Sequence, residues 1–561
     1  TLCFLKDINE VGDCRMCIVE VDGRKGFATS CIQKAEEGMV VHTHSPAVME
    51  ARRVILDLIL SNHHRDCLTC SRNGNCELQA LAMKFNVQHV EFEGEMTEHK
   101  VDDKSPAIMR DFNKCILCRR CVAACKNVQE IGAIDCINRG FESCISTVGD
   151  HSLNDVNCTF CGQCIEACPT GALKEKEYIK DVWRNLKDPD IYTVVQTAPA
   201  VRVALGEEFD MPIGTNVTGK MVSALKSLGF DRVFDTNTGA DLTIMEEANE
   251  FIDRFSKQEC LPMITSCSPG WVRFAEKNYP DLLGHLSSCK SPHEMMGAII
   301  KSYYAEKHNI DRSQICVVSI MPCTAKKFEK ERPANSVDGI KDVDVVLTTR
   351  ELAELIKRAG ILWKKLPEEE FDDDLIGEYS GAGAIFGVTG GVMEAAIRTA
   401  YHILTNQELE PIEFTPCRGL EGIKEATLKI NGVTYNFAMC SGMKNAKVLL
   451  EQIKNGESKY DFIEVMGCPG GCINGGGQPY VFPLFLPNEE DNIQETYIQK
   501  RASVLYGIDK GKKVRRSHLN PDIITLYKEY LGEYGSPKAH KLLHTTYNAE
   551  REKYPDINPV E

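Results

Sequence analysis

Short apolar runs alternate with amphipathic stretches along the chain beyond residue 190. Five of these runs have the length and β-branched or apolar character of strands: Tyr192 to Thr197, Leu261 to Thr265, Ile315 to Ile320, Val343 to Thr348 and Phe462 to Met466. Strands that alternate with helices form a largely parallel sheet, so we predict α/β structure here. Several runs end close to a cysteine, and α/β sheets place their sites at the carboxyl ends of strands.

The pattern before residue 180 is different. Nearly all closely spaced cysteines fall there, and the alternating run Ile18 to Val21 suits a strand of a β-grasp sheet. The charged segment Tyr178 to Asp190 ends in Asp-Pro-Asp and is predicted to be a linker. Because 561 residues exceed what one hydrophobic core holds, two or more domains are expected.

Composition narrows the function classes. The chain is 43% apolar and 26% charged, as in ordinary soluble proteins, and it has no apolar run of about 18 residues. A net charge of −16 argues against nucleic-acid binding. The 26 cysteines favour metal ligands over disulfides, which predicts a cytoplasmic metalloprotein. The chain opens at Thr1, almost directly on a cysteine motif, so we expect the first module to be N-terminally incomplete.

The first cysteine group has the spacing C-x10-C-x2-C-x13-C and consists of Cys3, Cys14, Cys17 and Cys31. This is a variant of the plant-type ferredoxin pattern, in which a tight loop presents thiolates to a 2Fe-2S cluster. A zinc site is the alternative, which the long first spacing disfavours.

The second group has the spacing H-x3-C-x2-C-x5-C and consists of His63, Cys67, Cys70 and Cys76. Three thiolates and one imidazole can hold either zinc or a 4Fe-4S cluster, so the spacing leaves both open.

The third and fourth groups repeat C-x2-C-x2-C-x3-C, first in Cys115, Cys118, Cys121 and Cys125, then in Cys158, Cys161, Cys164 and Cys168. In bacterial two-cluster ferredoxins the fourth cysteine of each run binds the other cluster. Cys125 is therefore expected with the second run and Cys168 with the first. Together the four groups predict one 2Fe-2S and three 4Fe-4S clusters acting as electron carriers in series.

We therefore predict a multidomain α/β and α+β chain. Its four domains are a β-grasp 2Fe-2S ferredoxin module in residues 1–45, a small His/Cys3 4Fe-4S module in 46–95, a bacterial two-cluster ferredoxin module in 96–180 and a large α/β domain in 190–561.

Three segments of the large domain carry a family resemblance: TSCSPGW at residues 265–271, MPCTAKK at 321–327 and EVMGCPGGC at 464–472. They resemble the three signature motifs of FeFe (iron-only) hydrogenases, and the last continues as INGGGQP, also as in that family. The resemblance covers essentially the whole chain and is best to the monomeric clostridial type with four accessory clusters. It also supplies His63 as a cluster ligand.

The resemblance implies an H-cluster in the large domain, namely a 4Fe-4S cubane bridged to a two-iron unit that bears CO, cyanide and an azadithiolate. Cys323, Cys468 and Cys472 would bind the cubane, with Cys472 as the bridge. Lys326 matches a lysine that donates to a cyanide ligand, although by itself it reads as a solvated side chain. Four residues match the walls of the two-iron unit, and by themselves they read as core packing: Pro199, Met321, Phe386 and Met466.

The resemblance also implies a proton route that runs through Arg254, Glu250, Ser287, Glu247 and Cys267. A thiol can relay protons because its ordinary pKa of ~8.5 is close to working pH. By their pattern alone, Glu246, Glu247 and Glu250 would be an exposed helix face.

One position departs from the family. Where two adjacent cysteines are usual, this chain has Cys267 and Ser268. A neutral serine is a poorer iron ligand than a thiolate. Either Ser268 binds through oxygen, which we favour, or Cys267 shifts to the cubane, or another thiol such as Cys289 or Cys417 approaches.

The implied function is a ferredoxin hydrogenase that reversibly reduces protons to H2. Its partners would be ferredoxin or a similar carrier and the maturation proteins of the two-iron unit, with no nucleic acid and no membrane. The alternatives are a non-catalytic iron-sulfur assembly factor, an H2 sensor and an electron-input subunit of a larger dehydrogenase. The complete third motif and Lys326 favour the enzyme. Four basic residues near a cluster loop are candidates for docking an acidic ferredoxin, or simply a solvated face: Lys114, Arg119, Arg120 and Lys126.

Overall fold

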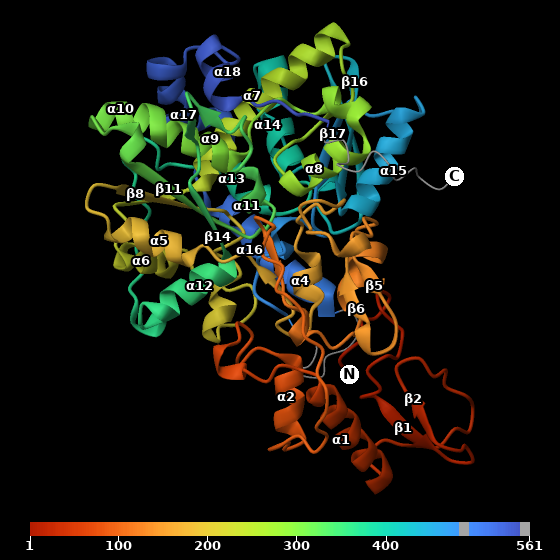
Figure 1. The fold of residues 1–561 in the computed structure, drawn as a ribbon. Helices are drawn as coiled ribbons and strands as arrows, with labels where there is room; N and C mark the ends of the chain where they lie inside the picture. Colours follow the sequence, from red (N-terminus) through yellow and green to blue (C-terminus); the bar gives the residue numbers. More distant parts are fainter. Residues whose placement is uncertain (482–492, 550–561) are drawn as a thin grey trace. The chain divides into compact units, whose positions relative to one another are not determined.

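The computed structural model describes residues 1–481 and 493–549. The chain forms two compact units (Figure 1). The first unit contains Thr1–Cys158 and Gln163–Lys176, and the second contains Thr159–Gly162, Glu177–Tyr480 and the described C-terminal residues. Among the described residues, no helix combines the length and apolar character that crossing a membrane requires.

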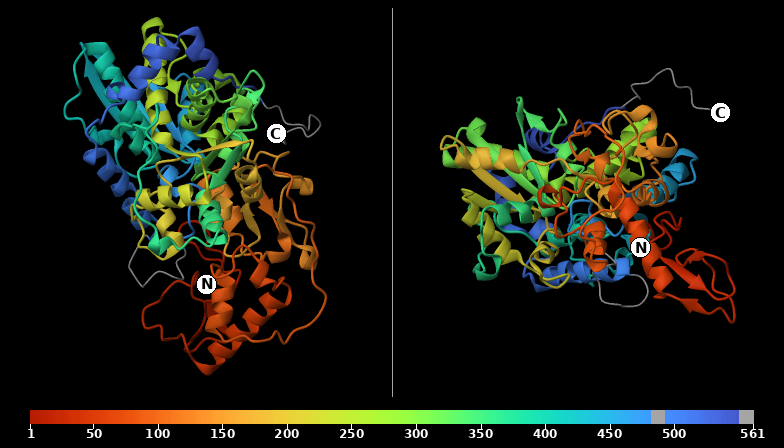
Figure 2. Two further views of the ribbon diagram at one scale, coloured as in Figure 1. Left: turned by 90° about the vertical axis from the view of Figure 1, so that its left-hand side faces the viewer. Right: turned by 60° about the horizontal axis from the view of Figure 1, so that its bottom comes forward.

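The first unit consists of short elements joined by cysteine-bearing loops. Its strands are β1 (Ile18–Val21), β2 (Phe27–Thr29), β3 (Val41–His42), β4 (Ile108–Arg110), β5 (Asp135–Ile137), β6 (Cys144–Ser146) and β7 (Leu173–Glu175). Its helices are α1 (Pro46–Ser61), α2 (Glu77–Lys84), α3 (Arg120–Ala123) and α4 (Gln163–Ala167). β1 pairs antiparallel with both β2 and β3, and the right-hand view of Figure 2 shows β1 and β2 as red arrows. The β-strand expected at Ile18 to Val21 is therefore present.

Helix α1 shows how the sequence sets these elements. The Ser45 side chain accepts a hydrogen bond from Val48 N, and proline stands at the first helical position. Both features favour a helix start, because the hydroxyl satisfies a backbone donor that the first turn leaves free. Buried Leu56 and Leu60 then face the small core of the unit.

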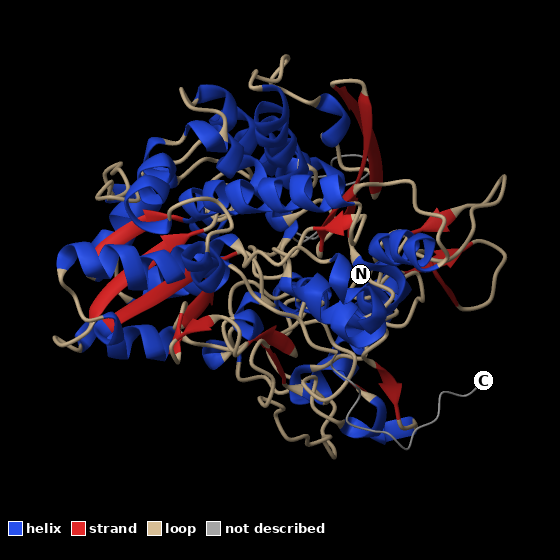
Figure 3. Cartoon of the chain, turned by 90° about the horizontal axis from the view of Figure 1, so that it is seen from above, coloured by secondary structure: helices blue, strands red, loops and turns tan. Residues whose placement is uncertain are grey.

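The first sheet of the second unit has the order β14-β11-β8-β9 and is entirely parallel. Its strands are β8 (Tyr192–Thr197), β9 (Arg232–Asp235), β11 (Ile315–Met321) and β14 (Val345–Thr348). All seven residues of β11 are buried, as expected for a central strand covered on both faces. Figure 3 shows this sheet as red arrows between blue helices.

The second sheet has the order β10-β17-β16-β15, in which β10, β17 and β16 run parallel and β15 antiparallel. Its strands are β10 (Met263–Ile264), β15 (Ile423–Ile430), β16 (Val433–Ser441) and β17 (Phe462–Met466). Asn431 and Gly432 join β15 to β16 with positive φ angles of 50° and 84°. An Asn-Gly pair favours such a two-residue hairpin turn.

The five predicted strands all form, but they belong to two sheets, so the prediction of one sheet is wrong. Tyr192 to Thr197 and Phe462 to Met466 agree residue by residue. The run from Leu261 shortens to β10, because Pro262 has no N–H to donate and the ladder starts at Met263. A further two-stranded ladder pairs β12 (Ser336–Val337) with β13 (Ile340–Lys341).

The α-helices of the second unit, within the described residues, are α5 (Ile179–Lys187), α6 (Thr218–Leu228), α7 (Thr236–Lys257), α8 (Pro269–Asn278), α9 (Pro292–Ile299), α10 (Ala305–His308), α11 (Lys326–Glu329), α12 (Thr349–Arg358), α13 (Gly381–Ala384), α14 (Gly391–Thr405), α15 (Met443–Lys454), α16 (Ile493–Gly511), α17 (Pro521–Leu526) and α18 (Pro537–Leu543). Helices α5, α6 and α12 contact the first sheet and lie on one side of it in Figure 1. The long helix α7 is buried over most of its length and packs against α9, α13 and α14.

The predicted linker is wrong. Residues 179–187 form helix α5, whose Ile179 and Val182 are fully buried in the main core of the second unit. Their spacing of three residues places both side chains on one helix face, and the charged residues between them occupy the other face. The charge that suggested a linker therefore belongs to an amphipathic helix.

Candidate active site and cluster-binding sites

The four cysteines of the first group converge in the first unit. Cys14 Sγ accepts a hydrogen bond from Leu2 N at 3.3 Å, and the sulfurs of Cys17 and Cys31 lie 3.2 Å apart as free thiols. The Cys3 side chain lowers the pKa of Cys14 to about 4, while burial and then Cys17 raise the pKa of Cys31 to about 12. Cys17 precedes β1 and Cys31 follows its partner β2. Backbone donors aimed at crowded sulfurs fit a cluster bound by four thiolates.

His63 of the second group is 7% exposed, and burial lowers its pKa to about 4. Within the described part of the chain its Nδ1 has no hydrogen-bond partner. A buried ring nitrogen without a partner is costly, and metal binding would relieve that cost. Burial raises the pKa of Cys76 and Cys70 adds to the effect, so these two thiols also lie close together.

One cavity of the first unit is lined by Cys115, Cys118, Cys121 and Cys168 together with apolar side chains such as Ile134. Burial raises the pKa of Cys118 above its usual range, and Cys168 adds to this. The structure thus places Cys168 with the first run of cysteines. An apolar cavity with four inward sulfurs fits a 4Fe-4S cubane.

The other crossed set is not brought together in one unit. Cys125, Cys158 and Cys164 belong to the first unit and Cys161 to the second. Cys125 Sγ accepts a hydrogen bond from Ala133 N at 3.3 Å, and burial raises the pKa of Cys125. Their joint binding of a cluster stays a prediction.

The basic residues expected to form a docking face are largely engaged within the first unit. Arg120 is 3% exposed and donates two hydrogen bonds to the carboxylate of Glu77, at 2.5 and 3.1 Å. Lys114 is held by two aspartates at 3.3 and 3.6 Å. The prediction of a docking face is therefore wrong for Arg120, and of the four only Arg119 and Lys126 are exposed.

The three signature segments begin where strands of the second unit end. Residues 265–268 follow β10, Cys323 follows β11 and Cys468 follows β17. Because β10 and β17 are parallel neighbours, their carboxyl ends lie together, and Val465 N donates to Thr265 Oγ1 at 3.1 Å. The expected grouping of chemistry at strand ends is therefore present, with both sheets contributing.

Buried thiols gather around Lys326 in these segments. Burial and then Cys323 raise the pKa of Cys472 to about 12, whereas Lys326 lowers it. Burial and then Glu247 raise the pKa of Cys267 well above its usual range, again opposed by Lys326. A cationic side chain among buried thiols suits an anionic cofactor held by thiolates.

The loop between Cys468 and Cys472 needs its glycines. Gly471 has φ of 100°, and a Cβ there would lie 2.7 Å from Thr389 N. Only glycine fits this backbone and this close approach. The loop can therefore pack tightly behind the two cysteines.

Lys326 is not a solvated lysine. It is 8% exposed, and its Nζ donates to Cys267 O at 3.1 Å and to Glu329 Oε2 at 2.7 Å. Glu329 Oε2 also lies 2.6 Å from His293 Nε2. Burial opposes ionisation of Glu329, but Lys326 and His293 together lower its pKa to about 2. Sequence reasoning missed both partners, although Glu329 stands one helical turn after Lys326, where side chains meet.

Ser268 lies beside the loop that carries Cys468. Its Oγ accepts a hydrogen bond from Gly467 N at 3.1 Å, and a Cβ on Gly467 would lie 2.8 Å from that oxygen. The two alternative thiols have partners outside the signature segments. Cys289 Sγ lies 3.7 Å from Glu250 Oε2, and Cys417 Sγ lies 4.0 Å from Met439 Sδ.

The predicted wall residues are buried. Phe386 and Met466 are 6% and 2% exposed and share one apolar cluster, against which Cys267 and Cys472 pack. Met321 is 3% exposed at the end of β11, and Pro199 is buried. An apolar enclosure of this kind excludes water from the thiols.

Three residues of the predicted proton route form a hydrogen-bonded series: Arg254, Glu250 and Ser287. Arg254 donates to Glu250 Oε1 at 2.6 Å, and Ser287 Oγ donates to Glu250 Oε2 at 2.8 Å. Burial and then Glu250 raise the pKa of Glu247 to about 8, and the Ser287 side chain lowers it. Glu246 and Glu247 are 1% and 2% exposed, so an exposed face is excluded.

Comparison with known families agrees with this geometry. The family described as iron only hydrogenase large subunit, C-terminal domain, matches residues 191–476, and the iron hydrogenase small subunit family matches 495–550. A 2Fe-2S iron-sulfur cluster binding domain matches residues 1–46. The NADH-ubiquinone oxidoreductase-G iron-sulfur binding region matches 52–91, and the ferredoxin-like domain of NADH-quinone oxidoreductase subunit 3 matches 105–174.

The chain is 48% identical to the NADP-reducing hydrogenase subunit HndD of Solidesulfovibrio fructosivorans, over 98% of this chain and 93% of that protein. It is 44% identical to iron hydrogenase 1 of Clostridium pasteurianum, over 97% and 94%. Among solved structures, the apo FeFe hydrogenase HydA1 variant from Chlamydomonas reinhardtii is 41% identical with a TM-score of 0.58, covering 66% of this chain and 98% of that chain. The chain therefore belongs to the FeFe hydrogenases, which interconvert protons, electrons and H2 at an H-cluster supplied through accessory iron-sulfur clusters.

Proposed function

We propose that Cys323, Cys468 and Cys472 hold the cubane of the H-cluster, with Cys472 as the bridge to the two-iron unit. The observation that carries this is the meeting of three signature segments at strand ends, with buried thiols around Lys326. When bound, the H-cluster supplies the redox-active iron at which protons and electrons combine. Pro199, Met321, Phe386 and Met466 enclose the two-iron unit.

Lys326 has a positioning and electrostatic role. Its Nζ is fixed by Cys267 O and Glu329, so within the described structure one of its three donors remains to hydrogen-bond an anionic ligand. A fixed ammonium in a buried site interacts more strongly than one in water.

Ser268 completes the cubane through its oxygen or coordinates it weakly, leaving Cys267 free to move protons. Its Oγ already lies beside the backbone that leads into Cys468, which supports this choice over Cys289 and Cys417.

Protons pass between solvent and Cys267 through Arg254, Glu250, Ser287 and Glu247. The raised pKa of Glu247, about 8, supports this role, because a group whose pKa is close to working pH gives up and regains a proton readily. Ser287 lies between the two carboxylates, and its hydroxyl can pass a proton in either direction.

Infrared spectroscopy of anaerobically matured protein tests this assignment. CO and cyanide stretching bands are expected in the parent protein. Their absence from protein matured together with its maturation proteins would contradict it and favour a non-catalytic assembly factor.

The chain carries one 2Fe-2S and three 4Fe-4S clusters, bound by the four ligand sets given in the sequence analysis. The unpartnered Nδ1 of His63 and the four-thiol cavity that includes Cys168 support two of these sets. Iron and sulfide analysis, together with EPR spectroscopy of the reduced protein, gives the number of clusters. Zinc bound by the His63 ligand set would contradict the 4Fe-4S assignment of that set.

The electron partner is ferredoxin or a similar small carrier in the cytoplasm. A second candidate is a larger complex that reduces NADP, favoured by the 48% identity to HndD. Purified chain should evolve H2 with reduced ferredoxin alone. If H2 evolution requires NADPH and copurifying subunits, the second candidate holds.

A further inference from the structure

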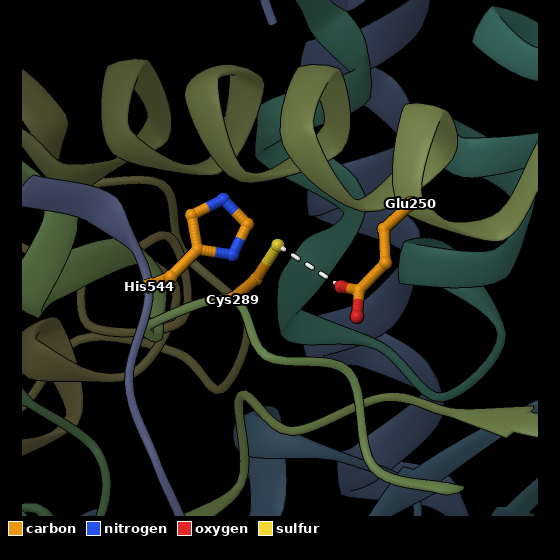
Figure 4. A group of neighbouring side chains, drawn as sticks. All are labelled: Glu250, Cys289 and His544. Atoms are coloured by element: carbon orange, nitrogen blue, oxygen red, sulfur yellow. Dashed lines mark hydrogen bonds between the residues drawn. The ribbon is translucent and has the colours of Figure 1, made fainter. Parts of the chain in front are cut away.

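The C-terminal segment after α18 lies against the proposed proton route. Thr545 N donates to Ser288 O at 2.7 Å, and Lys290 N donates to Leu543 O at 2.8 Å. This antiparallel bridge sets His544 opposite Cys289. Figure 4 shows Glu250, Cys289 and His544 pointing toward one another from three separate segments.

His544 is hydrogen-bonded at both ring nitrogens. Nδ1 lies 2.8 Å from Ser288 Oγ, and Nε2 lies 3.1 Å from Glu246 Oε2. Ser288 Oγ in turn donates to Glu250 Oε1 at 3.1 Å. A continuous series therefore joins Glu246, His544, Ser288 and Glu250, and it reaches Glu250 independently of Arg254.

The Glu246 carboxylate determines which nitrogen of the His544 ring carries a hydrogen. It accepts hydrogen bonds from Tyr527 Oη and from Gly535 N, the latter at 3.0 Å, so it is held as an acceptor. His544 Nε2 therefore carries a hydrogen toward Glu246. Nδ1 is left to accept a proton or to deliver one.

We propose that His544 and Ser288 form a second branch that delivers protons to Glu250. In the charged ring, Nδ1–H donates to Ser288 Oγ and the hydroxyl hydrogen of Ser288 donates to Glu250. Transfer breaks the N–H bond at Nδ1 as an O–H bond forms on Ser288, while the former Ser288 hydrogen forms an O–H bond on Glu250. No electrons are gained or lost, and His544 is recharged from water.

The branch ends near the surface. The side chain of His544 is 6% exposed, and the exposed ring of His540 stacks on it with centroids 4.5 Å apart. The titratable groups that face His544 in the described structure are Glu246 and, through Ser288, Glu250 from α7, Cys289 from the facing strand segment and His540 from α18.

The inference rests on the proposed role of Glu250, so the experiment includes variants of the branch residues and a variant of Glu250. Matured holoenzymes of His544→Gln, Ser288→Ala, their double variant and Glu250→Gln are compared with the parent. His402→Gln, a partly exposed histidine of the same unit with no bond to the branch, is the matched control. Rates of H2 evolution are measured across pH in H2O and D2O, with and without added imidazole.

We expect His544→Gln and Ser288→Ala each to lower the rate roughly tenfold, less than the ~10²-fold effect of losing a sole proton-transfer group, because Arg254 still serves Glu250. The pH profile should change, added imidazole should partly rescue His544→Gln, and the solvent isotope effect should rise. The double variant should be no worse than the worse single one, because both changes interrupt one series. The CO and cyanide bands should not move, whereas infrared difference bands of protonated carboxyl groups should shift.

Parent-like rates and pH profiles in both single variants would overturn the branch. Equal rate losses without any change in pH profile, isotope effect or carboxyl bands would overturn it too, leaving His544 a structural clamp. A parent-like rate in Glu250→Gln would instead refute the proposed main route through Glu250, to which the branch delivers its protons.

Discussion

Ser268 Oγ accepts a hydrogen bond from Gly467 N at 3.1 Å, so the residue that replaces an expected thiolate is fixed against the loop of Cys468. Among the described residues, this is the hydrogen bond that positions the oxygen. Its place supports a role at the cubane that its side-chain chemistry alone would not.

Ser268→Cys should alter the EPR signal of the cubane, because a thiolate binds iron more strongly than a neutral hydroxyl. Ser256→Cys, on the exposed end of α7, is the control and should leave the signal unchanged. An unchanged signal in Ser268→Cys would mean that another residue supplies the fourth ligand.

Glu329→Gln should release Lys326 and shift the cyanide stretching bands of the H-cluster. Removing one partner of a buried ion pair typically costs about 3–5 kcal/mol, so a lower unfolding free energy is also expected. The partly exposed Glu331→Gln is the matched control, measured by infrared spectroscopy and denaturant titration. Unmoved bands with Lys326 still in place would show that its hydrogen bond to Cys267 O suffices to hold it.

Glu247→Gln should stabilise the fold at neutral pH while abolishing most H2 evolution. The folded-state pKa of Glu247, about 8, is above its ordinary value of 4.5. Between these two pH values the Glu247 carboxyl is therefore ionised in the unfolded chain but protonated in the folded one. The free energy by which Glu247 destabilises the folded parent protein therefore grows up to about pH 8, by at most roughly 1.4 kcal/mol per pH unit. The gain in unfolding free energy should therefore be absent near pH 4 and increase toward pH 8.

Denaturant titrations of Glu247→Gln and the parent at a series of pH values check this dependence. Glu259→Gln, which is exposed, should run parallel to the parent. A constant difference across the series would mean that Glu247 is ionised in the folded protein.

His63→Ala should lose one cluster from the first unit, seen as lower iron content and one missing EPR component. His63→Cys should keep the iron but shift the reduction potential, because thiolate and imidazole ligands set different potentials. Exposed His89→Ala is the control. Unchanged iron in His63→Ala would remove His63 from the ligand set.

The sequence predicted the five strands, the cysteine groups and the signature segments, because spacing and short-range pattern carry that information. It did not predict that α5 is a buried helix. The charged residues of its exposed face are interleaved in the sequence with the buried ones, so the segment has the composition of a linker. It also missed the second sheet, although Asn431-Gly432 was a local hairpin signal. His293 and His544 carried no local signal at all, because each acts on a residue that only tertiary folding brings near.

The signature cysteines follow strands of two separate sheets, and this affects the order in which the protein can fold during its synthesis. Cys323 leaves the ribosome long before Cys472, and β10 acquires its neighbour β17 only when the later segment has emerged. The cubane site therefore cannot be assembled on the growing chain until most of the protein has been made. The first unit, whose proposed cluster ligands are nearly all close together in the sequence, is free to acquire its clusters earlier, so metal loading should proceed from the N-terminal end.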